Sequence, residues 1–528
     1  MSRDFHLPGR SPVMACEAMA ATSHPLATQA AVEMLRAGGT AADAAITAVA
    51  VQCVVEPHMT GIGGDCFCLV ARPDRPVWGY NGSGRSAEAV TAERLRADGL
   101  TAIAPDSIHA VTVPGAIEAW EAILKAHGRF GLDRALQPAI HYAEHGFPVA
   151  PRVGYDWSLA VEKLQKDRGA TRHYLVNGRA PKEGDVVKLP ALAATLKAIA
   201  CGGAQAFYQG AIADDIAATV KARGGFLAAS DLAAHRGEEA TPIETRYRDL
   251  DVVELPPNGQ GLTALVLLNI LEHFDFATLD PAGPERFHIA LEAARLAFAV
   301  RDTHIADPAF MPTSVESLLD KGFAARLAKL IDRERRSALP KAPTPASDTI
   351  YLTVVDRDRM AVSLINSLFN SFGAGVATTE KTGILLHNRG SCFVLEPGHP
   401  NAIAPRKRPM HTIIPALGMR DRRCTLSFGV MGSHYQPMGH AQLITNLVDY
   451  GMDIQQAIDL PRMFFEGDQV VVENGVPPAT IEGLRARGHD VVARALPLGG
   501  GQAIRIDWER GVLIAGSDAR KDGCAIGY

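Results

Sequence analysis

Apolar and polar residues follow each other in a way that predicts helices in the first part of this chain and strands in its last third. Helical periodicity runs over residues 27–36 and stops at Gly38-Gly39, and Thr40 is placed to cap a second helix that continues to about Val55. This second helix is apolar on nearly every side, so we expect it to be buried. Further strands are expected at residues 66–70, 77–80, 247–255 and 424–428, and further helices at 116–126, 262–272, 285–301, 315–331, 440–450, 454–457 and through most of 130–240.

Strands at both ends of the chain, with helices between them, indicate one α+β body built of stacked layers. The length of 528 residues alone would also allow about two to four separate domains. The sequence contains no internal repeat, however, and its one low-complexity segment is residues 336–346. This segment is rich in proline and polar residues, so we predict that it is a linker and not part of the core.

The linker runs directly into the first candidate for chemistry, Ser347-Asp348-Thr349. The apolar residues that follow, up to Ile365, predict two paired strands. A strand that opens with Asp-Thr after a linker is typical of the place where an N-terminal-nucleophile hydrolase cuts its own chain. Cleavage between Asp348 and Thr349 would give Thr349 a free α-amine beside its hydroxyl, so that one residue would hold both nucleophile and base. The alternative is a plain loop followed by a threonine-rich strand.

Composition narrows the possible partners and cofactors. The formal charge of -5 is small for this length and argues against a nucleic-acid partner. No apolar run is long enough to span a membrane and no signal peptide is recognisable, so we expect a cytoplasmic protein with free thiols and no membrane contact. The eight cysteines form no CxxC pair, and no P-loop, GxSxG, SxxK or HExxH motif occurs. The glycine-rich loop 61–64 precedes a strand, which does not fit a dinucleotide site. We therefore expect neither a cofactor nor a metal.

A second candidate for chemistry is the turn that ends in Gly432-Ser433, between a predicted strand and a helix that begins near Gln436. Successive backbone N–H groups at such a turn can stabilise an oxyanion. The alternative is an ordinary glycine turn. His434 and His440 lie close by and could act as bases, but buried histidines more often have a structural role in hydrogen bonding.

Taken together, these segments resemble the γ-glutamyltranspeptidase family of N-terminal-nucleophile hydrolases, over almost the whole chain. The resemblance implies a four-layer α-β-β-α sandwich made as one precursor. It implies self-cleavage between Asp348 and Thr349 into a large subunit, 1–348, and a small subunit, 349–528. The two subunits would form a heterodimer, and two heterodimers could associate. The segments that carry the resemblance are Ser23–Ala27, Leu35–Ala45, Gly61–Gly64, Val113–Gly115, Asp307-Pro308, Thr349–Asp356, Lys407–Pro409, Asp449–Gly451, Pro461-Arg462 and Ser517-Asp518.

The resemblance also implies the roles of four residues. Thr349 would attack the carbonyl carbon of a small amide substrate, with its own α-amine accepting the proton. Ser367 falls where the family has a threonine that orients the nucleophile. The backbone N–H groups of Gly432 and Ser433 match the family's oxyanion hole, and Ser433 stands in place of a glycine. We expect that replacement to be tolerated only if φ at Ser433 is not strongly positive. Water would then release the acyl group, or an acceptor amine would do so in a transferase.

The predicted substrate site departs from that of γ-glutamyl enzymes. Their Phe-Arg-Glu segment, whose arginine binds the glutamate α-carboxylate, is missing, and Arg85 lies two places later. Phe369, Cys392 and Arg389 fall where the family has the asparagine, aspartate and glutamine that hold the substrate ammonium. A phenyl ring cannot accept a hydrogen bond from an ammonium as those oxygens do, and a guanidinium would repel it.

Two further departures concern the walls of the pocket. The family's paired serines are His411 and Thr412 here. Only eleven residues lie between Phe393 and Pro405, which predicts a shorter lid and a more open pocket.

These changes resemble a subgroup that contains oxamate amidohydrolases and glutathione-hydrolase-like proteins. Arg85 and Arg389 together would suit a substrate with a carboxylate and no ammonium, whereas the alternative for Arg389 is a salt bridge beneath the pocket. We therefore predict hydrolysis of a small acid amide such as oxamate. The alternatives are glutathione hydrolysis or γ-glutamyl transfer, an activity like that of the cephalosporin acylase relatives, and a catalytically dead binding protein with the same fold.

Overall fold

The computed structural model describes residue 6 and residues 9–338 and 349–528 of the chain. Asp348 and most of the predicted linker, from residue 339 onward, lie outside the described residues. Thr349 is the first described residue of the last third and immediately precedes a strand.

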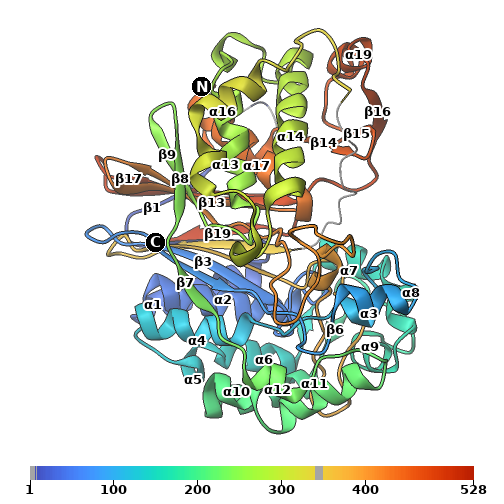
Figure 1. Cartoon of the computed structure of the whole chain (residues 1–528). Helices are drawn as coiled ribbons and strands as arrows, with labels where there is room; N and C mark the ends of the chain where they lie inside the picture. The colour runs from blue at the N-terminus through green and yellow to red at the C-terminus, as the bar shows by residue number, and fades with distance from the viewer. Residues whose placement is uncertain (1–5, 7–8, 339–348) are drawn as a thin grey trace.

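Two antiparallel sheets of seven strands each lie face to face at the centre of the molecule (Figure 1). A hydrogen bond joins their facing surfaces, because Thr353 Oγ1 donates to Ser427 Oγ at 2.6 Å. In spatial order the first sheet contains β1 (Val13–Ala15), β18 (Val512–Ser517), β17 (Gly500–Asp507), β13 (Arg423–Met431), β12 (Ala416–Arg420), β9 (Leu250–Glu254) and β8 (Ile243–Tyr247). The second contains β19 (Cys524–Gly527), β2 (Met19–Thr22), β10 (Ile350–Val355), β11 (Ala361–Ser367), β3 (Asp65–Ala71), β4 (Trp78–Gly82) and β7 (Glu238–Ala240).

Helices cover the outer face of each sheet, so the four-layer α-β-β-α sandwich is confirmed (Figure 1). The outer face of the second sheet carries α1 (Pro25–Arg36), α2 (Ala41–Val55) and α4 (Ala116–His127). The first sheet is covered by α13 (Gly261–Leu271), α17 (Gln436–Val448) and α18 (Ile454–Asp459), with α14 (Pro284–His304) packed on α13. The prediction for α2 is confirmed, since all its residues are buried and Thr40 caps it by accepting a hydrogen bond from the Asp43 N–H.

The remaining elements surround these layers. The helices are α3 (Ala92–Ala97), α5 (Leu132–Ala135), α6 (Gln137–His145), α7 (Pro151–Ser158), α8 (Val161–Gln165), α9 (Arg168–Tyr174), α10 (Pro190–Tyr208), α11 (Ala211–Lys221), α12 (Ala229–Ala233), α15 (Val315–Leu319), α16 (Lys321–Ala328) and α19 (Pro478–Ala486). Two small sheets consist of β14 (Met463–Glu466), β15 (Gln469–Val472) and β16 (Asp490–Ala493), and of β5 (Phe147–Pro148) and β6 (Val186–Val187). Among the described residues, no helix combines the length and apolar character needed to cross a membrane.

Three element boundaries differ from the sequence prediction for local reasons. The helix expected over 315–331 is two short helices, because Asp320 accepts a hydrogen bond from the Phe323 N–H and starts a new one. The strand expected over 247–255 begins only at Leu250, as β9, because a turn with Arg248 at φ +55° separates it from β8. The strand expected over 424–428 continues as β13 to Met431.

Strands from both sides of residues 339–348 share the same sheets. In the second sheet β10 and β11 lie between β2 and β3. In the first sheet β12 and β13 lie between β9 and β17. The two predicted subunits therefore form one body with a common core.

Candidate active site

The β10–β11 hairpin brings Thr349 next to Ser367. Ile350 pairs with Asn366 in this antiparallel register, which places the residue before β10 opposite the last residue of β11. Both side chains are fully buried, and Thr349 Oγ1 lies 3.0 Å from Ser367 Oγ. Ser367 Oγ also accepts a hydrogen bond of 2.8 Å from the Phe369 backbone N–H, which fixes its position. Ser367, at the end of β11, thus holds the Thr349 hydroxyl just before the start of β10.

The glycine-rich loop 61–64 packs closely against the backbone at Ser367, the last residue of β11. A Cβ atom on Gly64 would lie 2.3 Å from the Ser367 carbonyl oxygen, and one on Gly63 would lie 2.0 Å from the Leu385 carbonyl oxygen. No side chain fits at either position, so the glycines allow two backbone segments to meet directly.

The turn at Gly432 and Ser433 follows the end of β13. Gly432 has φ +126°, and Ser433 has φ +54°, in the left-handed region. The condition stated for tolerating a serine here, a φ that is not strongly positive, is therefore not met. A neighbouring side chain explains how the serine is tolerated there, because Gln260 Nε2 donates to the Ser433 carbonyl oxygen at 2.9 Å and to that of Thr412 at 2.7 Å. These two bonds offset a backbone cost of roughly 1–2 kcal/mol.

Arg389 is a buried cation with unused hydrogen-bonding capacity. Its side chain is fully buried and donates from Nη1 to Thr412 Oγ1 at 2.7 Å. Its guanidinium carbon lies 4.1 Å from the centre of the Phe369 ring. Within the described part of the chain, Nε and Nη2 have no nitrogen or oxygen hydrogen-bond partner and no carboxylate lies within ion-pair distance, while the guanidinium interacts with the Cys392 thiol. The alternative of a salt bridge beneath the pocket therefore finds no support.

His411 is an anchor for the segment that carries Thr412. Its Nε2 lies 3.0 Å from Asp65 Oδ2, and His387 Nδ1 lies 3.3 Å from the same oxygen. The Gly84 N–H donates to Asp65 Oδ1 at 3.0 Å. Burial alone would raise the pKa of Asp65, but the two histidines and these hydrogen bonds hold it well below its ordinary value. The sequence prediction missed Asp65, although it directly follows the Gly61–Gly64 loop.

Arg85 is not brought together with the other predicted site residues. Its Nη1 donates to Asp307 Oδ2 at 3.2 Å and to the Arg406 carbonyl oxygen at 3.1 Å, and its Nη2 lies 3.9 Å from Glu238 Oε2. About a third of its side chain is exposed. These acidic neighbours occupy the guanidinium, so this geometry assigns Arg85 to a structural ion-pair network.

A cavity of about 360 Å³ lies beside these residues and opens to solvent. Phe369 and Cys392 line it as predicted, whereas Thr349 and Arg389 are buried and do not reach it. Asp302, at its edge, has a side chain that is 46% exposed. The other lining residues are Pro105, Arg301, Ile305, Asn370, Ser391, Phe393, Val394, His399, Asn401, Met410 and His434.

The shortened segment between Phe393 and Pro405 forms one wall of this cavity. Val394 and Ile403 close it into a compact loop, since the Ile403 N–H donates to the Val394 carbonyl oxygen at 3.1 Å. His399 Nε2 lies 3.0 Å from the Asp302 carbonyl oxygen, which ties the loop to α14. The loop therefore borders the cavity at Asp302, whose side chain is 46% exposed.

The two candidate histidines have different surroundings. His440 Nε2 accepts from the Val430 N–H at 3.2 Å and its Nδ1 lies 2.7 Å from Glu254 Oε1, so His440 is a buried structural residue. His434 lines the cavity, and its Nδ1 lies 2.9 Å from Arg301 Nη1. The sequence prediction did not include Arg301, Gln260 or this arrangement of His434.

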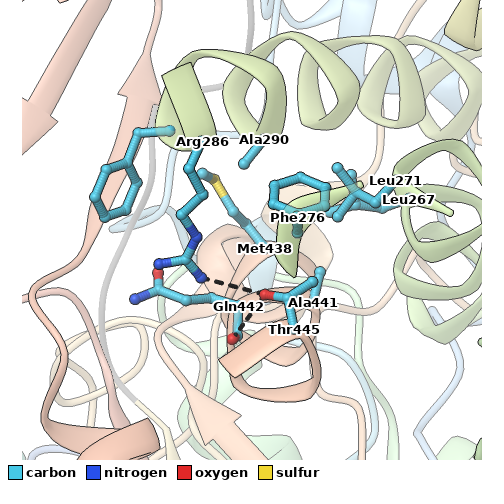
Figure 2. Close-up of a pocket in the computed structure, with 10 residues that line it drawn as sticks. Leu267, Leu271, Phe276, Arg286, Ala290, Met438, Ala441, Gln442 and Thr445 are labelled. Atoms are coloured by element: carbon cyan, nitrogen blue, oxygen red, sulfur yellow. Dashed lines mark hydrogen bonds between the residues drawn. The ribbon is translucent and has the colours of Figure 1, made fainter. Parts of the chain in front are cut away.

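A second pocket, between α13, α14 and α17, is too small to bind a substrate (Figure 2). Its volume is about 10 Å³, which leaves room for no more than about one water molecule. Arg286 borders it, with Nη2 donating to Thr445 Oγ1 at 3.2 Å and to Asn446 Oδ1 at 2.6 Å. The cavity beside Phe369 is the candidate substrate site because Phe369, which lines it, contacts both Ser367 and Arg389.

Comparison with known proteins gives the same picture across the whole chain. Residues 27–528 match the family model described as gamma-glutamyltranspeptidase. The chain is 40% identical to the glutathione hydrolase-like YwrD proenzyme of Bacillus subtilis, over 98% of this chain and 99% of that protein. It is 34% identical to the oxamate amidohydrolase proenzyme of Klebsiella pneumoniae, over 97% and 98%. The crystal structure of a cephalosporin acylase from Bacillus halodurans superimposes with a TM-score of 0.93 at 38% identity, covering 100% of this chain and 99% of that one.

Proposed function

The chain belongs to the γ-glutamyltranspeptidase family of N-terminal-nucleophile hydrolases, and we propose that it is a precursor that cleaves itself between Asp348 and Thr349. The observation that carries this proposal is the 3.0 Å contact between the hydroxyls of Thr349 and Ser367 at the start of β10. Cleavage would leave segments 1–348 and 349–528 associated as a heterodimer, because strands of both segments pair with each other in each sheet.

In the proposed mechanism Thr349 acts as nucleophile and base. Its Oγ1 attacks the amide carbonyl carbon while its free α-amine accepts the hydroxyl proton. The N–H groups of Gly432 and Ser433 stabilise the oxyanion, and Ser367 keeps the nucleophile oriented. The C–N bond then breaks and the departing amine takes up the proton. Water attacks the resulting ester, the acid product leaves, and the Thr349 hydroxyl is restored.

The acyl part of the substrate is proposed to carry a carboxylate and no ammonium, as in a small acid amide such as oxamate. The two unpartnered N–H-bearing nitrogens of Arg389 support this, since charge-assisted hydrogen bonds to a carboxylate contribute about 1.5–3 kcal/mol. Phe369 both lines the cavity and covers the Arg389 guanidinium, so a shift of this ring would connect the two. Cys392 offers no counter-charge to an ammonium, because burial raises the pKa of its thiol.

Intact mass and N-terminal sequencing of the purified protein test the processing step. We expect two chains, the smaller one beginning at Thr349. A stable single chain of 56.3 kDa would instead favour the catalytically dead binding protein.

Three p-nitroanilides then identify the acyl group. The glutaryl compound has a carboxylate, the γ-glutamyl compound has the same skeleton with an added ammonium, and the pentanoyl compound has neither. We expect the glutaryl compound to be the best substrate. Preference for the γ-glutamyl compound would favour a glutathione hydrolase or γ-glutamyl transferase, and equal turnover of the pentanoyl compound would favour a general acylase.

A further inference from the structure

His434 lines the cavity, and its contact with Arg301 fixes which ring nitrogen carries the proton. Its Nδ1 lies 2.9 Å from Arg301 Nη1, and a guanidinium can only donate, so Nδ1 must accept. In a neutral imidazole the proton is then on Nε2. Burial, reinforced by the positive charges of Arg301 and Arg389, lowers the pKa of His434 well below its ordinary value and keeps the ring neutral. His434 therefore offers an N–H and cannot serve as a base.

Arg301 is itself held firmly enough to set this polarity. It is almost fully buried, its Nε donates to Asp302 Oδ1 at 2.7 Å, and its guanidinium carbon lies 4.3 Å from the centre of the Phe298 ring. Its Nη1 also donates to Gln260 Oε1 at 2.9 Å. The Gln260 amide is thereby oriented with Nε2 toward the Ser433 carbonyl oxygen. One arginine thus orients both the histidine ring and the side chain that holds the turn at Ser433.

The position of His434 indicates which part of the substrate it contacts. It directly follows Ser433 and lines the cavity, whereas Arg389 is buried and does not. The amine portion must leave while the acyl group is still attached to Thr349, so it has to lie on the side that opens to solvent. That side is the cavity bordered by Asp302 and His434.

We propose that His434 donates its Nε2–H to an acceptor oxygen in the amine portion of the substrate, and that Arg301 is the positioning residue that fixes this donor. The inference rests on the proposed function and extends it to the leaving group. The amine would carry a carbonyl or carboxylate close to its nitrogen, as an amino acid or a peptide does.

Three glutaryl amides with different amines test the contact: glutaryl-glycine, glutaryl-glycinamide and glutaryl-propylamine. They carry a carboxylate, a neutral carbonyl and no acceptor. His434→Phe should lower kcat/KM about tenfold for the amides with acceptors and leave the propylamide unchanged. His434→Gln keeps an N–H donor and should recover most of the loss. Glycine and glycinamide leaving groups affected alike would indicate recognition of a carbonyl, and a larger loss with glycine would indicate a carboxylate.

Separate readouts distinguish failure of this inference from failure of the proposed function. Each variant is first checked by mass for the chain that begins at Thr349, and its turnover of glutaryl-p-nitroanilide is measured. Normal processing with equal losses on all three amides, or with no loss on any, would overturn the role of His434 alone. A wild-type protein that neither cleaves itself nor hydrolyses any amide would overturn both.

The tautomer can be read without any turnover. In protein labelled with ¹⁵N-histidine, His434 should carry its proton on Nε2, and His440 should carry it on Nδ1 because its Nε2 accepts from the Val430 N–H. The two rings are assigned by loss of their signals in His434→Gln and His440→Gln. Arg301→Lys keeps a donor and should preserve the His434 tautomer, whereas Arg301→Met should release it. An Nδ1 proton on His434 in the wild-type protein would refute the inference.

Discussion

Arg286 and Arg389 are both buried arginines with no carboxylate in ion-pair range among the described residues, but their surroundings differ. Arg286 donates to Thr445 (Figure 2). It also donates to Asn446 and, at 2.6 Å, to the Pro281 carbonyl oxygen. Arg389 donates one hydrogen bond to an oxygen, and two of its nitrogens have no nitrogen or oxygen partner in the part of the chain that the structure describes. Burial of a charge is therefore common to both regions, and unused hydrogen-bonding capacity is what sets the second one apart.

The backbone shows the same contrast. Arg286 lies in α14 and its side-chain partners Thr445 and Asn446 lie in α17, within regular helix. Around Arg389, Phe369 has φ +78° and Ser433 has φ +54°. Non-glycine residues with positive φ, next to polar groups without hydrogen-bond partners, indicate a site that binds a ligand.

The largest expected difference between the two regions comes from their threonines. Thr349→Ala should abolish chain cleavage and lower amide turnover by at least about a thousandfold, because it removes the nucleophile. Thr445→Ala removes one hydrogen-bond acceptor of Arg286 and should lower the free energy of unfolding by about 1–2 kcal/mol, with processing and activity intact. Intact mass measures cleavage, the p-nitroanilide assay measures turnover, and urea unfolding measures the free energy of unfolding. Cleavage or activity in Thr349→Ala would refute the proposed mechanism.

The arginines themselves should respond in opposite ways. Arg389→Met removes a poorly paired buried charge, so stability should not fall, but turnover of the glutaryl substrate should drop about tenfold to a hundredfold. Arg286→Met removes the donor from three oxygens, two of them buried, and should lower the free energy of unfolding by about 3 kcal/mol. Urea unfolding is best measured in the Thr349→Ala background, where the chain stays single.

Equal destabilisation by the two methionine substitutions would remove the distinction on which the substrate assignment rests. The pentanoyl substrate is the control for activity, because it has no carboxylate and its turnover should not depend on Arg389.

Local signals allowed the sequence to predict part of this picture. The cap at Thr40, the β10–β11 pairing and the layered fold follow from nearby residues, and the Asp-Thr junction marks Thr349. The ion pair between Arg85 and Asp307 joins residues more than two hundred positions apart, so nothing near Arg85 indicated that its charge is already occupied. Other contacts of this long-range kind explain why several residues of the site were missed: Asp65, Gln260, Arg301 and the oriented ring of His434.

A smaller effect is expected from pH in α17, the helix that also carries the Arg286 partners Thr445 and Asn446. Burial lowers the pKa of His440, in α17, to about 3, whereas its ordinary value is 6.5. Below pH 6.5 the unfolded chain binds a proton that the folded chain does not. Through this residue the free energy of unfolding falls as the pH drops below 6.5. Burial raises the pKa of its hydrogen-bond partner Glu254, which acts in the opposite direction. In the Thr349→Ala background, His440→Gln should give a shallower dependence on pH than the parent, and identical slopes would contradict the assignment.

The smallest expected effect separates backbone strain from chemistry in the reactive region. Ser433 needs its left-handed φ, while its Oγ is buried and has no partner within the described residues. Ser433→Gly removes the steric cost of a Cβ atom at this φ and should raise the free energy of unfolding by about 0.5–1 kcal/mol. If only the backbone N–H stabilises the oxyanion, processing and kcat should stay within about twofold of the wild-type values. A large loss of kcat without a loss of stability would instead show that the Ser433 hydroxyl takes part in the reaction.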